Sequence, residues 1–143
     1  MSKVKNLGAS GRRKRAHRGQ AMVEFALLTP VFVMLLFAIV EFSQAAYAYS
    51  FVSYAARDAS RWASVRGKSS DFPASAGDIR NFVDSQTHGM SLQNLTITTS
   101  WAPDNKPGSV VKVQVRYNMP LSMPFIPTKS IPLTSTSQMV IAE

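Results

Sequence analysis

Residues 20–67 read QAMVEFALLTPVFVMLLFAIVEFSQAAYAYSFVSYAARDASRWASVRG, and this stretch favours one long helix. Its first part is almost entirely apolar: residues 25–40 carry no charge, and only Thr29 and Pro30 interrupt the run. The run is short for a membrane span, which needs about 20 residues, but apolar residues on both flanks lengthen it. The remaining chain is too small to wrap a core helix that is apolar on all sides. We therefore predict a transmembrane helix.

Beyond Glu41 the pattern becomes amphipathic. Apolar side chains recur at helical spacing, at Phe42, Ala45, Ala46, Tyr49, Val52, Ala56, Ala59 and Ala63. If residues 20–66 are all helical, the helix is about 70 Å long, whereas a bilayer core is about 30 Å thick. The second half must therefore protrude. Its aromatic residues either form an aromatic belt at the outer membrane interface or pack on the downstream domain: Tyr47, Tyr49, Phe51 and Tyr54.

The rest of the chain predicts a small domain after a linker at residues 68–77, which is rich in Ser, Pro and Gly. Residues 78–88 resemble a short helix, with Asp78 as its N-terminal cap or first-turn acid. Alternation predicts strands at residues 92–101, 111–117 and 130–141, and the first of these places Leu95, Ile97, Thr99 and Trp101 on one side. Residues 103–108 form the turn between the first two strands. Four prolines at residues 120–132 suit a crossover that does not pair centrally.

The predicted fold class is thus α+β: a long N-terminal transmembrane helix extends into a small C-terminal domain with a short helix and about three antiparallel strands. So few strands make a minimal core, and we expect the protruding half of the helix to cover the apolar face of the sheet. The predicted organisation is a basic leader at residues 1–19, the transmembrane and protruding helix at 20–67, and the α+β domain at 68–143.

The positive charge of the chain is concentrated at its N-terminus. The formal net charge is +8, from 16 basic and eight acidic residues. Seven basic residues and no acidic ones lie in residues 1–19: Lys3, Lys5, Arg12, Arg13, Lys14, Arg15 and Arg18. This segment has no apolar periodicity, so we predict that it is disordered. A basic flank before an apolar helix orients the N-terminus to the cytoplasm, which makes the cluster from Arg12 to Arg18 a topology signal.

Catalysis, metal binding and cofactor binding have no support in the sequence. The chain has no cysteine, and its two histidines are His17, in the leader, and His88, at the end of the predicted short helix. No nucleophile, metal-ligand or phosphate-loop pattern is present. The remaining chain is nearly neutral, which argues against a folded nucleic-acid module. We predict a protein that is not an enzyme, with no cofactor, no metal and no nucleic-acid partner.

The junction between the basic and apolar segments resembles the N-terminal region of TadE-like proteins, which are pilin-like components of tight-adherence (Flp-type) pilus systems. The matching features are Arg18-Gly19-Gln20-Ala21, Val23-Glu24-Phe25-Ala26-Leu27, Pro30, Val40-Glu41-Phe42 and the stretch from Ala55 to Arg61. The resemblance is strong over residues 18–67, and the C-terminal strands match only in kind. Thr29 stands where many family members have an apolar residue.

The resemblance implies a minor pilin (pseudopilin) or pilus-assembly membrane protein with a pilin-like fold. A membrane prepilin peptidase would cut between Gly19 and Gln20, and Glu24 would become the fifth residue of the mature chain. Glu24 would then neutralise the new N-terminal amine of a neighbouring subunit, or it would merely lie at the level of the headgroups. The candidate assembly residues are Glu24, Glu41, Phe25 and Pro30. Glu41 either lies at the outer interface or pairs with a cation of a partner pilin.

The implied partners are the membrane, the prepilin peptidase, other pilins and tight-adherence assembly proteins, in a hetero-oligomer. The implied location is the bacterial inner membrane, with one span, a cytoplasmic N-terminus and an extracytoplasmic domain, or the pilus into which the protein is incorporated. Three alternatives stay open. A Sec signal peptide ending at the A-x-A pattern of residues 46–48 would release a secreted binding domain. An uncleaved chain would be a permanent single-pass anchor, or would bind nucleic acid or anionic lipid through residues 12–18.

Overall fold

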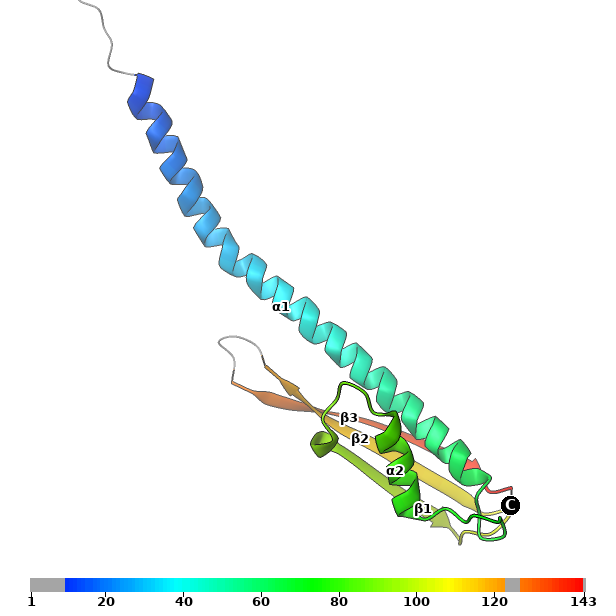
Figure 1. Cartoon of the computed structure of the whole chain (residues 1–143). Coiled ribbons are helices and arrows are strands. Elements are labelled where there is room, and N and C mark those ends of the chain that lie inside the picture. The colour runs from blue at the N-terminus through cyan, green and yellow to red at the C-terminus, as the bar shows by residue number, and fades with distance from the viewer. Residues whose placement is uncertain (1–9, 123–126, 143) are drawn as a thin grey trace, which may run out of the picture. The chain divides into compact units, whose positions relative to one another are not determined.

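The computed structural model describes residues 10–122 and 127–142. Its elements are helix α1 (Ser10–Ser64), helix α2 (Ala76–Gln86), the 3-10 turn η1 (Leu92–Asn94) and strands β1 (Leu95–Ala102), β2 (Val110–Leu121) and β3 (Lys129–Val140) (Figure 1). The chain divides into two units, one ending at Val40 and the other beginning at Glu41. The predicted α+β class is confirmed, with a long apolar helix, a short helix and three antiparallel strands.

Helix α1 begins earlier than expected. The prediction that residues 1–19 are disordered is wrong from Ser10 onward, and residues 1–9 lie outside the described part. Arg, Lys and Ala are good helix formers, so the basic segment can extend a helix that the apolar segment stabilises. The helix ends at Ser64, slightly before the predicted end at residue 67.

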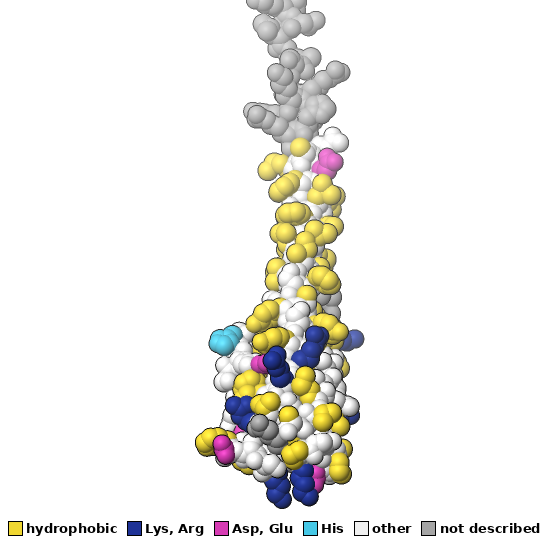
Figure 2. All heavy atoms as spheres, turned by 90° about the vertical axis from the view of Figure 1, so that its right-hand side faces the viewer, with side chains coloured by type: hydrophobic (Ala, Val, Ile, Leu, Met, Phe, Trp, Pro, Cys, Tyr) yellow, Lys and Arg dark blue, Asp and Glu magenta, His cyan; other side chains and the backbone are white. Residues whose placement is uncertain are grey.

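The apolar segment of α1 has no partner within the described chain. The helix from Gly19 contains a window long and apolar enough to cross a membrane, and none of that window is buried. Figure 2 shows the apolar side chains that crowd the surface of this segment. Pro30 lies inside the helix without ending it. The hydroxyl of Thr29 donates a hydrogen bond to the carbonyl of Phe25 at 2.7 Å, so the polar group is satisfied within the helix.

The second half of α1 belongs to the core of the domain, as predicted. One face of this half buries small side chains against the sheet: Ala48, Val52, Ala55, Ala56, Ala59 and Ala63. The hydroxyls of Ser60 and Ser137 share a hydrogen bond at 2.8 Å, and the amide of Ala142 donates to the carbonyl of Ser64 at 2.8 Å. The three tyrosines of this half, Tyr47, Tyr49 and Tyr54, are all exposed, and of these only the Tyr47 hydroxyl donates a hydrogen bond to another part of the described domain, the carbonyl of His88.

The sheet has the order β1-β2-β3, with both pairs antiparallel. Its inner face is apolar, and the central strand buries Val111, Val113, Val115, Tyr117 and Met119. Leu95, Ile97, Thr99 and Trp101 share this side of β1, as predicted. The alternate residues of all three strands face outward, so the sheet has one covered face and one solvated face.

The expected crossover at residues 120–132 is shorter than predicted, because its first and last prolines lie in strands. Pro120 pairs with Ser130 and Pro132 pairs with Asn118, so both belong to strands of one long hairpin. The expectation that they avoid central pairing holds. β1 pairs no further than Tyr117, which leaves Pro120 beside a single neighbouring strand, and Pro132 lies on the edge strand β3. A residue without an N–H group is tolerated at such positions.

Helix α2 begins at Ala76 because Ser75 and Asp78 form a capping box. The Ser75 hydroxyl accepts from the amide of Asp78, and the Asp78 carboxylate accepts from the amide of Ser75. Asp78 is therefore the first-turn acid, and Ser75 is the cap. The helix ends at Gln86, two residues before the predicted end, and buries Ile79 and Val83. Much of the expected linker is held in place, because Lys68 donates to the carbonyl of Asn105 and Ala74 to that of Arg66.

Candidate processing and assembly site

Gly19 occupies a helical position that does not require glycine. A methyl group added at Gly19 would meet no atom within 4 Å, and both Gly19 and Gln20 are exposed. Glycine inside a helix is less favourable than alanine by about 1 kcal/mol. The described fold therefore provides no reason for glycine here.

Glu24 is an exposed carboxylate within the apolar segment of α1. It makes no hydrogen bond or ion pair with any residue of the described part of the chain. Its neighbour Phe25 is also exposed, at 72% of its surface. A carboxylate in apolar surroundings is costly unless a cation or hydrogen-bond donor meets it. Any partner for Glu24 must therefore come from the leader side chains, which lie outside the described part, or from another molecule.

Glu41 differs sharply from Glu24. Only 8% of its surface is exposed, because the side chain turns into the domain. Its Oε1 accepts a hydrogen bond from the backbone N–H of Ser122 at 3.2 Å. Its Oε2 is buried and has no partner among the described residues. Glu41 thus ties the end of β2 to α1, and its part in assembly stays a prediction.

The other predicted residues divide between the described and undescribed parts of the chain. Pro30 removes the hydrogen bond to the carbonyl of Ala26 but lies within a continuous helix. The topology cluster is helical in its backbone, but its side chains lie outside the described part: Arg12, Arg13, Lys14, Arg15 and Arg18.

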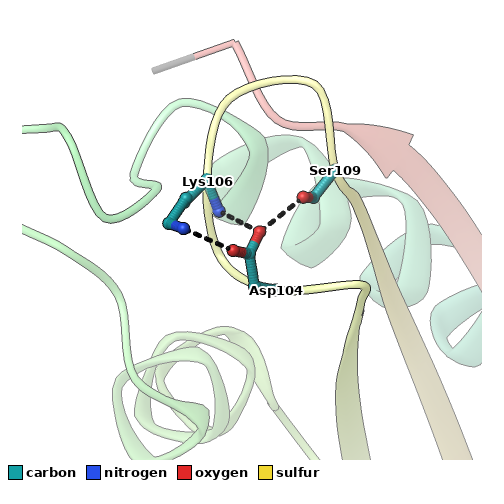
Figure 3. A network of polar contacts seen from close by, with 3 residues as sticks. All are labelled: Asp104, Lys106 and Ser109. Carbon is teal, nitrogen blue, oxygen red and sulfur yellow. Dashed lines mark hydrogen bonds and ion pairs between the residues drawn. The ribbon is translucent and has the colours of Figure 1, made fainter.

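Asp78 and Asp104 each stabilise a local backbone structure. Asp104 lies in the turn between β1 and β2, where it accepts from the Ser109 hydroxyl at 2.7 Å and from the Lys106 amide, and pairs with the Lys106 ammonium at 3.0 Å (Figure 3). The Ser109 and Lys106 bonds lower the pKa of Asp104. The hydroxyl and then the amide of Ser75 lower the pKa of Asp78. Within the described ranges, no group of three or more His, Asp or Glu side chains could hold a metal ion.

Two features were not found from the sequence. The Glu41–Ser122 bond joins residues 81 positions apart, and no local pattern announces it. At the other end of the domain, Trp62 stacks on Phe82 with ring centroids 5.0 Å apart, and the Arg66 guanidinium lies 4.3 Å from the Trp62 ring centroid. The helical spacing of Trp62 and Arg66 was visible in the sequence, but the position of Phe82 required the fold.

Residues 19–61 match the family model described as TadE-like protein. The predicted resemblance is confirmed, and the match begins at Gly19 and includes the exposed apolar segment and most of the amphipathic half of α1. This family suggests a protein related to pilus assembly, and it is not an enzyme family. No curated protein and no solved structure matches the chain.

Proposed function

We propose that this protein is a minor pilin (pseudopilin) of a tight-adherence pilus system, cut after Gly19 and assembled through the apolar half of α1. The observation that carries the proposal is Gly19 itself. The residue is unfavourable in a helix, and the space around it would accept a side chain. A protease that must bind an extended backbone supplies the missing reason, because glycine leaves no side chain to clash in its groove.

Cleavage at this bond would convert the chain into an assembly subunit. The leader carries seven of the 16 basic residues, which would hold the junction at the cytoplasmic headgroups until the prepilin peptidase removes them. The new N-terminus would be the amine of Gln20, in a segment that offers it few polar partners. A cation at this depth needs a carboxylate.

Glu24 would provide that carboxylate to a neighbouring subunit. It is exposed and has no partner within the described chain, so an incoming amine would neutralise it without breaking another contact. Phe25 and Pro30 lie on the same apolar segment, which would pack against the helices of other pilins. Glu41 already accepts the Ser122 amide, and we assign it the secondary role of fixing the β2–β3 hairpin to α1.

The secreted alternative fits the packing poorly. Cleavage at the A-x-A pattern would remove Ala48, of which only 3% is exposed, and Tyr47, whose hydroxyl donates to His88. It would also remove Glu41 and its bond to Ser122. A domain that begins at Tyr49 would therefore lack part of its core helix.

Terminal-peptide mass spectrometry of the protein from native membranes tests the proposal. We expect a mature chain that begins at Gln20 in cells with the prepilin peptidase, and one that begins at Met1 or Ser2 in cells without it. A chain that keeps its leader in both strains would instead be a permanent anchor. A chain that begins at Tyr49 would establish the secreted alternative.

A further inference from the structure

The outward face of the sheet is uncovered. α1 and α2 both contribute buried residues to the core on the inner face, where Val111, Val113 and Val115 are fully buried. The alternate residues Lys112, Gln114 and Arg116 of the central strand are exposed. No described element covers these side chains.

This face carries positive charge without any compensating acid. The sequences of β1, β2 and β3 contain no Asp or Glu. Lys112 and Arg116 lie on the outward side of β2 and form no ion pair with a residue of the described chain. The described carboxylates of the domain lie on other elements: Glu41 and Asp58 on α1, Asp71 between α1 and α2, Asp78 and Asp84 on α2, and Asp104 in the β1–β2 turn. The two cations are therefore free to meet an anionic partner.

The strand register places neutral hydrogen-bonding groups on both sides of each cation. Lys112 lies between Ser100 and Gln138, and Arg116 lies between Thr96 and Thr134. Between these two rows is a third, Thr98–Gln114–Thr136, which is wholly neutral. Neighbouring strands are about 4.8 Å apart, and four residues along a strand span about 13 Å. The outward face is thus a regular array of hydroxyl and amide groups with two cations about 13 Å apart.

We propose that this face binds a linear acidic polysaccharide. The cations would meet carboxylate or sulfate groups, and the Thr, Ser and Gln side chains would exchange hydrogen bonds with sugar hydroxyls. A single-stranded nucleic acid fits less well, because its sites stack bases on aromatic side chains and no outward position of the three strands is aromatic. The inference does not depend on cleavage at Gly19 or on incorporation into a pilus.

Binding can be measured with the full chain in sealed proteoliposomes of neutral lipid, sorted so that the domain faces outward. The basic leader is then enclosed in the lumen and cannot reach the polymer. Alginate is the carboxylated probe, heparin the sulfated probe and dextran the neutral one. We expect alginate or heparin to bind in a salt-sensitive manner and dextran not to bind.

The decisive variant is Lys112→Gln with Arg116→Gln, which should weaken binding about tenfold. Its matched control is Lys68→Gln with Arg80→Gln, which removes two charges elsewhere in the domain and should change binding less than about twofold. Thr98→Val with Thr136→Val tests the hydroxyl row and should weaken alginate binding without changing its salt dependence. Equal losses in the charge variant and its control would overturn the proposal, as would no binding of either acidic probe. Tighter binding of single-stranded DNA than of alginate would assign the face to nucleic acid instead.

Discussion

Variants of Gly19 test whether glycine is required at this position for cleavage rather than for folding. α1 begins at Ser10, so the bond between Gly19 and Gln20 lies inside a helix that must unwind before a protease can bind it. Gly19→Ala stabilises the helix by about 1 kcal/mol. Because 1.4 kcal/mol corresponds to a factor of ten, the unwound population should fall about fivefold. Gly19→Leu stabilises the helix by a similar amount and adds a side chain that must fit the protease groove.

We therefore expect cleavage to slow about fivefold in Gly19→Ala and much more in Gly19→Leu. Neither change should affect insertion or domain folding, since Gly19 is exposed and a Cβ added there meets no atom within 4 Å. The assay is pulse-chase labelling in cells with the prepilin peptidase, read by terminal-peptide mass spectrometry. The double variant Gly19→Ala with Ala21→Gly restores local helix flexibility, so it isolates the side-chain requirement at residue 19. Normal cleavage of Gly19→Leu would refute both the site and the reasoning.

Three further predictions concern assembly, packing and pH. Glu24→Ala should leave membrane insertion unchanged and sharply reduce the amount of assembled pili, measured by shearing and quantification; wild-type pilus yield would remove the proposed role of Glu24. Ala59→Leu places a large side chain where the helix is fully buried against the sheet, and should cost about 1–3 kcal/mol in a thermal unfolding measurement, whereas Tyr54→Leu on the exposed side should cost little. The pKa of Asp78 is lowered in the folded protein, so its carboxylate stabilises the fold above the ordinary aspartate pKa of 3.8, and this stabilisation is lost as the pH falls through the folded pKa. Asp78→Asn should therefore make the free energy of unfolding depend less on pH in acid. Identical pH dependence in the variant and the wild type would contradict this.

Local periodicity was sufficient for much of the fold. The apolar run of α1 and the alternation of β2 are each visible within a dozen residues, and both were located correctly. Gly19 and Glu24 were named from the resemblance to TadE-like proteins, whose matching residues lie together at the junction of the basic and apolar segments. The capping box was only half recognised: Asp78 was noticed, but the cap itself is Ser75, three residues earlier.

Features that depend on contacts between residues far apart in the chain could not be predicted from local sequence patterns. The hairpin tolerates Pro120 because β1 ends before it, and it tolerates Pro132 because β3 is an edge strand. Neither the extent of β1 nor the strand order is encoded near the prolines. The burial of Glu41 likewise depends on Ser122. The array of hydroxyl groups and cations on the outward face also depends on the strand register, which places Thr96 and Thr134 beside Arg116.

The two halves of α1 differ in the size of the side chains that they present, and this difference sets what each half can do. Before Glu41 the helix carries large apolar groups, such as Phe32 and Leu35, that stay exposed within the described chain. After Glu41 its inner face carries alanines, and small side chains let a helix and a sheet approach closely and bury Ala55 and Ala59 completely. The second half therefore packs within the chain, whereas the first half stays exposed within the described part and is long and apolar enough to cross a membrane. A single continuous helix can serve both purposes because the change in side-chain size occurs at Glu41, where the domain begins.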